Sequence, residues 1–258
     1  MRYSFNHFFI TIIAIVSATF MGFQDLSAEE KTITFATEEW KDATNRDGTG
    51  LYWDILRAVF DSEGYQVTPL IRSYSGSVTL VRNGTVDGMI GAYIDEIKEG
   101  LYPEHHFAVD IVQALYKKKS KIKWDGIETI KGKRLAWIEG YSFNQYLPRS
   151  VMYTTSLRRV DSRKIGVNLL LLSKRDFVLD AEGDIKDFFK ENQAYQIKDF
   201  VMQPICELKL YIVFSKTEKG KRLTQVFDQN FSKLLKAGVI KKMYKKYSGK
   251  NFTLPSDF

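Results

Sequence analysis

The residues that most often carry out chemistry are few in this sequence, and their spacing is unfavourable. His105 and His106 are neighbours, so they cannot share one face of a helix or strand, and we expect no metal site on them. Adjacent acids such as Glu38-Glu39 are weak evidence for a catalytic pair, because a chain with 31 acidic residues contains such neighbours by chance. The HExxH, GxSxG, P-loop and CxxC motifs are absent. We therefore predict no catalytic residue, no metal, no cofactor, and a protein that is not an enzyme.

The single cysteine, Cys206, rules out an internal disulfide. Free cysteine is commonly buried, so we interpret Cys206 as a small core residue rather than as a reactive thiol. The fold must then rest on its apolar core. A composition of 44% hydrophobic and 14% aromatic residues, with only 5 Pro and 17 Gly, is typical of a globular protein with such a core.

The net charge of +7 is compatible with nucleic-acid or anionic membrane partners. The lysines are spread over residues 117–123, 216–222 and 236–250, which favours solvated faces instead. Together with an export signal, this argues against nucleic acid as a partner. We expect a monomer.

The export signal is predicted in residues 1–28. Arg2 is followed by an apolar stretch from Phe8 to Phe23 and by small residues that end at Ala28, which is the layout of a secretory signal peptide. The stretch is shorter than the roughly 20 apolar residues that a membrane span needs. We expect cleavage after Ala28, with an uncleaved anchor as the alternative, and no lipid anchor because no cysteine lies nearby. Either way the protein is predicted to be periplasmic.

Strand-like and helix-like segments alternate through the first half of the chain. Residues 32–37 and 65–71 are β-rich, and residues 50–60 between them place apolar side chains at helical spacing. A short helix over 77–82 and a buried strand over 88–93 follow. This alternation predicts a mainly parallel sheet with helices on its faces.

The second half repeats the pattern. The strands predicted there cover residues 110–119, 134–138, 176–179 and 208–215. The helices predicted there cover residues 144–147, 167–172 and 185–191. Residues 219–247 have an amphipathic pattern that predicts two packed helices.

In this order, several short motifs resemble the type II periplasmic binding proteins, in the extracellular solute-binding family 3 that mostly serves amino-acid ABC importers. The motifs are the helix GLYWDILRAVF with Asp54, LVRNGTVD before a buried strand, IKGKRLAWIEG, and KRDFVLD. They span essentially the whole chain after the signal peptide.

The resemblance implies an α/β fold of two lobes, each a mainly parallel sheet flanked by helices, joined by two crossing strands and closing on a ligand by a hinge motion. We expect lobe 1 to cover residues 29–116 and lobe 2 to cover 117–206. Residues 207–258 return to lobe 1 and end in the C-terminal helices.

Ligands of open α/β sheets bind beyond the carboxyl ends of the strands, which selects the loops that follow them. Aromatic rings there could stack on an apolar or cationic group, and Ser142 could hold an anion at a helix start or simply cap that helix. The predicted ligand-binding residues are Glu38, Trp40, Arg72, Tyr74, Tyr93, Lys98, Tyr141, Ser142, Phe143 and Asp180.

One departure from the family pattern concerns the ligand. Members that hold an α-carboxylate usually have an Arg in a Thr-x-x-Arg turn after the strand that here ends near Tyr93. This sequence has Tyr93-Ile94-Asp95-Glu96-Ile97-Lys98 instead. Lys98 lacks the planar fork that matches a carboxylate, and Arg72 is another possible cation. Asp180 matches only approximately the acid that meets an α-amine.

We therefore predict a binding protein for a small solute, amino-acid-like but not a standard α-amino acid, that serves the permease of an ABC importer. One alternative is a periplasmic sensing or interaction module. The other is a dehydratase-like enzyme on the same fold, with Glu38 or Glu207 as a general acid whose pKa is raised by burial.

Overall fold

The computed structural model describes residues 31–258. The predicted signal peptide, residues 1–28, lies outside these described residues. Within them, no helix is long and apolar enough to cross a membrane.

The strands form one continuous sheet in the order β2-β1-β3-β9-β5-β8-β6-β7, with β4 paired to β9. Their bounds are β1 (Lys31–Thr37), β2 (Tyr65–Ile71), β3 (Gly88–Tyr93), β4 (Gly100–Leu101), β5 (Ala108–Lys117), β6 (Arg134–Ile138), β7 (Ser156–Val160), β8 (Phe177–Ala181) and β9 (Phe200–Ser215).

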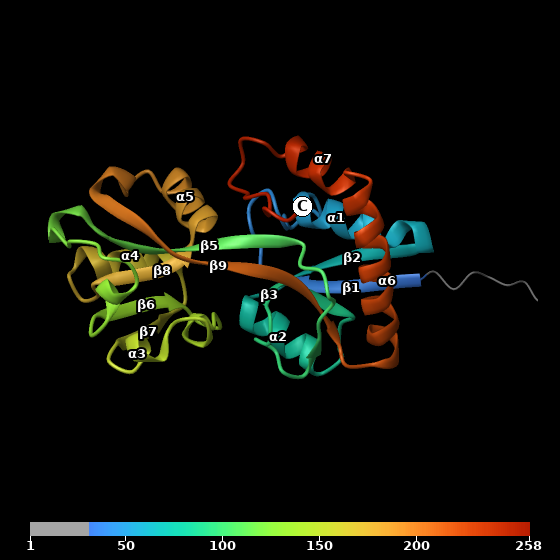
Figure 1. The fold of residues 1–258 in the computed structure, drawn as a ribbon, viewed down its shortest axis with the longest axis horizontal. Helices are drawn as coiled ribbons and strands as arrows, with labels where there is room; N and C mark the ends of the chain where they lie inside the picture. The colour runs from blue at the N-terminus through green and yellow to red at the C-terminus, as the bar shows by residue number, and fades with distance from the viewer. Residues whose placement is uncertain (1–30) are drawn as a thin grey trace, which may run out of the picture.

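Helices cover the sheet at both ends of the molecule (Figure 1). They are α1 (Leu51–Phe60), α2 (Tyr74–Arg82), α3 (Arg149–Met152), α4 (Arg163–Leu171), α5 (Glu182–Glu191), α6 (Glu218–Lys236) and α7 (Val239–Lys246). We call β1–β4 with α1, α2, α6 and α7 lobe 1, and β6–β8 with α3–α5 lobe 2.

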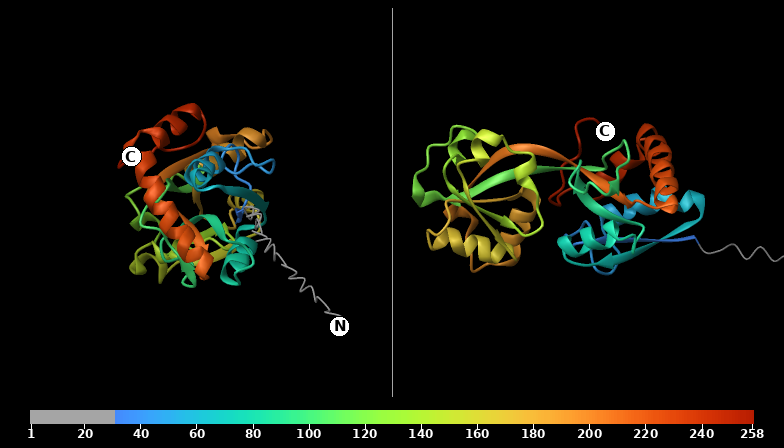
Figure 2. Two further views of the ribbon diagram at one scale, coloured as in Figure 1. Left: turned by 90° about the vertical axis from the view of Figure 1, so that its right-hand side faces the viewer. Right: turned by 90° about the horizontal axis from the view of Figure 1, so that it is seen from below.

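Two long antiparallel strands, β5 and β9, run from one lobe into the other (Figure 2). Their ladder extends from the pair Ala108–Leu210 to the pair Lys117–Phe200. The register shifts between Val112 and Gln113, a bulge of the kind that bends a strand. The predicted α/β fold of two lobes with two crossing strands is thereby confirmed. The lobe limits at residues 117 and 206 remain a prediction.

Each lobe has its own aromatic core. In lobe 1, the rings of Phe35, Phe60 and Phe214 lie within 6.2 Å of one another, centroid to centroid. In lobe 2, the buried ring of Phe177 packs edge-on against Tyr116 and Trp124. Large rings are therefore buried at both ends of the sheet.

Three sequence-based expectations needed correction. The helix expected over residues 144–147 is a single 3₁₀ turn, Phe143–Gln145, because Pro148 disfavours helical backbone at the residue before it. Strand β7 was not predicted, since it is an edge strand with mostly exposed side chains. Strand β9 begins at Phe200 rather than at residue 208, and its first half contains Pro204 and alternates too little to be recognised.

Apart from α3 and β4, which the sequence did not predict, the remaining elements agree with the predicted alternation to within a few residues at their ends. The two packed C-terminal helices are α6 and α7, which are separated by Gly238 in the left-handed conformation. Both helices pack against α1.

Candidate functional site

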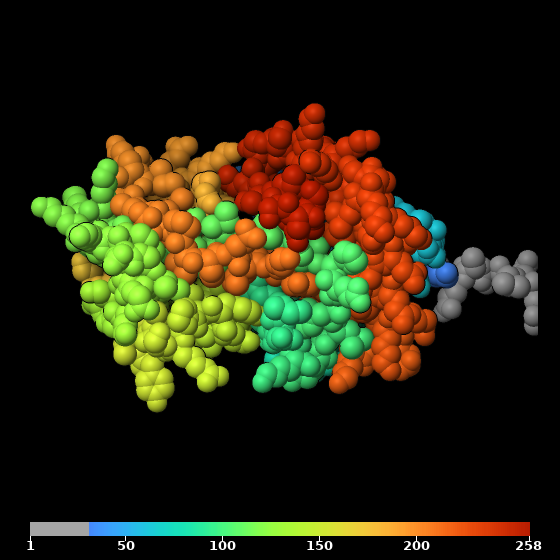
Figure 3. Space-filling view, in the orientation of Figure 1, coloured from blue at the N-terminus to red at the C-terminus, as the bar shows by residue number. Residues whose placement is uncertain are grey.

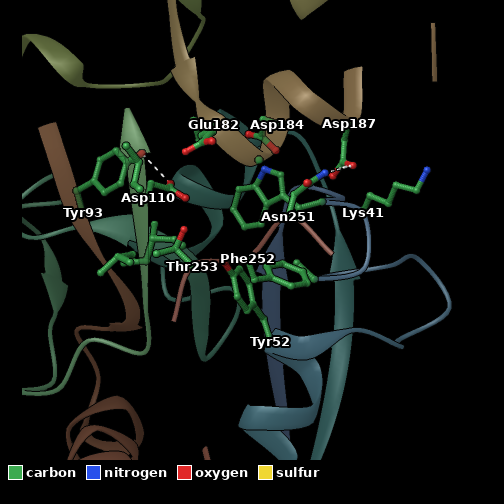
Figure 4. A pocket seen from close by; sticks show the side chains of 18 of the residues that line it. Lys41, Tyr52, Tyr93, Asp110, Glu182, Asp184, Asp187, Asn251, Phe252 and Thr253 are labelled. Atoms are coloured by element: carbon green, nitrogen blue, oxygen red, sulfur yellow. Dashed lines mark hydrogen bonds between the residues drawn. The ribbon is translucent and has the colours of Figure 1, made fainter. Parts of the chain in front are cut away.

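A cavity lies between the lobes at the carboxyl ends of β1 and β3, where an open α/β sheet binds its ligands (Figure 4). Lobe 1 contributes mainly aromatic rings, lobe 2 mainly acids, and β5 runs beneath. The lining side chains used below are those of Trp40, Lys41, Tyr52, Tyr74, Tyr93, Asp110, Tyr141, Glu182, Asp184, Asp187, Asn251, Phe252 and Thr253.

Trp40 is held in the loop after β1. Its backbone N–H donates to Thr44 Oγ1 at 2.9 Å, and that hydroxyl donates to the Glu38 carbonyl at 2.8 Å. The indole ring lies directly on the backbone of Gly91 in β3. A Cβ at residue 91, where φ is +88°, would lie 2.5 Å from Trp40 Cη2. The glycine therefore provides the space that the ring occupies.

Two tyrosine hydroxyls in lobe 1 donate to carboxylates, one buried (Glu96) and one half-buried at the cavity (Asp110). Tyr74 donates to Glu96 Oε2 at 2.6 Å, and Tyr93 donates to Asp110 Oδ2 at 3.0 Å. Burial raises the pKa of Glu96 and raises that of Asp110 to about 6. At neutral pH Asp110 is thus an ionised group in an environment that favours its neutral form.

Arg163, the first residue of α4, lies among acids on the lobe 2 side. Its Nε donates to Asp180 at 2.7 Å, and its Nη2 donates to Asp184 and, at 3.1 Å, to the Tyr141 hydroxyl. Burial alone would lower the pKa of Arg163, but the two carboxylates outweigh it and hold that pKa well above its usual value. Burial also raises the pKa of Asp180 and Asp184 despite the guanidinium.

Glu38 lies at the edge of this group, in a neighbouring hollow with Arg163 and Asp184. Its Oε2 atom is buried and has no hydrogen-bond partner among residues 31–258. The pKa of Glu38 is raised, chiefly by burial and to a smaller extent by the negative charge of Asp180. The positive charge of Arg163 opposes this increase but does not cancel it. The cleft therefore holds more buried carboxylates than cations to neutralise them.

The lobes touch on both sides of the cavity, so the conformation is closed. On one side, Tyr146 donates its hydroxyl to the Ile94 carbonyl at 2.7 Å, and the rings of Tyr74 and Tyr141 meet at 5.3 Å. On the other side, Lys41 Nζ lies 2.6 Å from Glu191 Oε1. These contacts join lobe 1 to lobe 2 directly, across the opening.

The C-terminal segment, residues 251–258, closes part of the cleft; Figure 3 shows it in red where the lobes meet. Asn251 Nδ2 donates to Asp187 in α5 at 2.6 Å, and Thr253 pairs with Val109 of β5. The far end is fixed to lobe 1, because Asp257 lies 3.0 Å from both His106 Nε2 and Lys209 Nζ.

The predicted site residues fall into three groups. Trp40, Tyr74, Tyr93 and Tyr141 line the cavity. Phe143 packs behind Tyr93 at 6.1 Å, Ser142 adjoins the Glu96 carboxylate, Glu38 lies beside Arg163, and Asp180 is 1% exposed and paired with it. Arg72 and Lys98 are exposed and do not line the cavity.

Sequence reasoning missed several residues that the structure brings to the site. For Asp110 the sequence contains an indication, since it is a charged residue inside the apolar run of β5. For Arg163 the indication is weak, because the residue follows the unrecognised strand β7. The sequence gives no indication for three C-terminal residues, since the segment after α7 has no periodic pattern; these are Asn251, Phe252 and Thr253.

Comparison with known proteins agrees with this architecture. No family model matches the sequence, and no curated protein does. Among solved structures, a histidine kinase sensor domain with similarity to periplasmic binding proteins matches with a TM-score of 0.71 at 17% identity, covering 86% of this chain and 98% of that one.

Two further matches are similar in extent. The substrate binding protein of an amino acid ABC transporter matches with a TM-score of 0.66 at 15% identity, covering 85% of this chain and 100% of its own. The ancestral amino acid-binding protein AncCDT-1, a precursor of cyclohexadienyl dehydratase, matches with a TM-score of 0.65 at 15% identity, covering 85% and 96%.

At these identities the likeness establishes the fold. This chain has the two-lobed fold of the type II periplasmic binding proteins, as the sequence predicted. Its structural neighbours include the substrate-binding proteins of amino-acid ABC transporters.

Proposed function

We propose that this chain is an exported, periplasmic solute-binding protein that captures a small polar or charged ligand between its lobes and delivers it to the permease of an ABC importer. The observation that carries the proposal is the cavity itself, whose walls come from both lobes. Trp40 and Tyr93 lie on one side and Tyr141 and Asp184 on the other. A ligand that touches both sides stabilises the closed form by its differential affinity for it.

The ligand is proposed to be amino-acid-like without being a standard α-amino acid. The positions of Arg72 and Lys98 support this, because neither reaches the cavity to pair with an α-carboxylate. We further propose that the protein acts as a monomer and makes and breaks no covalent bond.

A thermal-shift screen tests solute binding. The purified protein is unfolded and refolded to remove any carried ligand, and then mixed with amino acids, polyamines, organic acids, short peptides and sugars. A ligand that binds only the folded state raises Tm with concentration. If no compound raises Tm at millimolar concentration, the proposal fails.

A sensing role is the second candidate, and the likeness to a histidine kinase sensor domain favours it. Both roles use the same cavity. They differ in the partner that recognises the closed form, which is a permease in transport and a receptor in sensing. Uptake of a labelled ligand, measured in cells with and without this protein, separates them. Loss of uptake supports transport, whereas intact uptake with a lost response to the ligand supports sensing.

An enzymatic role has one observation in its favour, since Glu38 carries a buried oxygen and a pKa raised by burial, as a general acid requires. Glu207 is exposed on β9, outside the cavity lining. Mass spectrometry of each ligand after long incubation with the protein tests this role, because any product would show turnover.

A further inference from the structure

The charge of the cavity indicates which class of solute it takes, provided that the proposed binding function holds. Its lining carries Lys41 as a cation against four carboxylates, which are those of Asp110, Glu182, Asp184 and Asp187. Lys41 is already paired with Glu191 at 2.6 Å on the rim. A ligand that enters therefore meets a surplus of negative charge.

Most of these carboxylates have partners within the protein. Glu182 pairs with Lys186 in the same helix, Asp184 with Arg163, and Asp187 accepts from Asn251. Asp110 differs, because its hydrogen-bond partner among residues 31–258 is the neutral hydroxyl of Tyr93, and no ion pair to it is formed there. It is thus a cavity carboxylate without a counter-ion.

Two of the three guanidinium nitrogens of Arg163 already donate within the protein. Arg163 is shared between Asp180 and Asp184 and also donates to Tyr141. Arg163 is also not among the residues that line the cavity, so a ligand carboxylate held there would meet carboxylates without a guanidinium to pair with.

The aromatic walls favour a cation too. The cavity is lined by six aromatic residues, and aromatic faces attract cations through their negative quadrupole; the six are Trp40, Tyr52, Tyr74, Tyr93, Tyr141 and Phe252. Asp110 and Tyr93 lie beside each other at one end of this box (Figure 4). Rings and carboxylate together form a site for an ammonium or guanidinium group.

We infer that the solute is a small organic cation without a carboxylate of its own, such as an aliphatic amine, with Asp110 as its counter-ion. The inference rests on the proposed function, but it allows fewer ligands. If the cleft binds an anion or an amino acid, solute binding is supported and this inference is contradicted.

Probe pairs that differ only by an α-carboxylate provide the test. Calorimetry of the refolded protein compares agmatine with L-arginine and putrescine with L-ornithine, with L-glutamate and succinate as anionic probes. We expect agmatine or putrescine to bind at least tenfold more tightly than its carboxylated partner. We also expect Asp110→Asn to weaken that binding at least tenfold. The control variant Asp125→Asn, which changes an exposed acid outside the cavity, should bind as the native chain does.

Two outcomes would overturn the inference alone. One is equal or tighter binding of L-arginine or L-ornithine than of the decarboxylated partner, and the other is binding of glutamate or succinate. In both cases solute binding stands. If no probe binds, the cation inference falls, and the wider thermal-shift screen decides whether solute binding falls with it.

Discussion

The two lobes face the cavity with different chemistry. Lobe 1 presents mainly rings, from Trp40, Tyr52, Tyr74 and Tyr93, whereas lobe 2 presents mainly acids and the Arg163 cluster behind them. Ring contacts supply area and tolerate many ligands, while buried charges discriminate between ligands. The difference suggests a division of roles, in which the rings of lobe 1 hold the solute, Asp110 on β5 pairs with its charge, and the acids of lobe 2 affect which solute allows closure.

The largest effect is expected from Arg163→Ala, which removes the cation on which lobe 2 depends. The buried Asp180 and the half-buried Asp184 would lose their cation, and breaking a buried pair in this way costs about 3–5 kcal/mol of stability. Urea unfolding measures it. The control is Arg134→Ala, because Arg134 is exposed and its pair with Asp176 is screened by solvent, so that its loss should change stability little.

The pH dependence of that loss identifies its cause. Burial already raises the pKa of Asp180 and Asp184, and removing the guanidinium raises both pKa values further. An acid with a raised pKa in the folded state destabilises the fold as the pH rises through its unfolded-state value. The deficit of Arg163→Ala should thus be greatest at neutral pH and shrink in mild acid. A deficit independent of pH would point to lost packing instead.

The next effect concerns the ring wall of lobe 1. In Gly91→Ala, the new Cβ at φ +88° would meet the Trp40 ring at 2.5 Å and force it away. We expect ligand affinity to fall about tenfold or more, corresponding to about 1.4 kcal/mol. Gly126→Ala is the matched control, because its φ is +63° with nothing within 4 Å, so it carries backbone strain without moving a ring. Calorimetry with the ligand found by screening compares the two.

Removing the rings themselves should cost somewhat less. Trp40→Ala in lobe 1 and Tyr141→Ala in lobe 2 each remove one ring, and a desolvated cation–π contact contributes about 0.5–2 kcal/mol. We expect about 2- to 30-fold weaker binding from each, and Trp40→Phe to retain most of the affinity. If both alanine changes leave Kd unaltered, the ligand does not lie between the lobes.

Binding should also depend on pH through Asp110. Because burial raises its pKa to about 6, the acid is largely protonated at pH 5 and ionised at pH 7. A cation prefers the ionised form, so its affinity should rise by up to about tenfold over this interval and level off above it. Titrations at each pH with Asp110→Asn should give a flatter profile; an equally steep one would assign the effect to Glu38 or to the acids around Arg163.

The site residues of lobe 1 could be predicted from the sequence better than those of lobe 2. The rings Trp40, Tyr74 and Tyr93 follow strands with clear apolar patterns, so their place at the cavity could be inferred from strand ends alone. In lobe 2, the main cation follows β7, a polar edge strand whose pattern does not distinguish it from a loop. The contacts of residues 251–253 depend on where α7 ends in space, which no local pattern encodes.

The smallest effect is expected from the contact that joins the lobes on the ring side. Tyr146→Phe removes the hydroxyl that donates to the Ile94 carbonyl at 2.7 Å, while its ring can still pack against Tyr93. Such a bond contributes about 0.5–1.5 kcal/mol, and we expect it to break when the lobes separate. Affinity should fall about 2- to 10-fold through faster dissociation, with stability of the unliganded protein unchanged if that form is open. Stopped-flow dissociation and urea unfolding separate these quantities. A loss of stability without a change in dissociation would mean that the lobes stay closed without ligand, so that the bond is present in the free and the bound protein alike and cancels from the affinity.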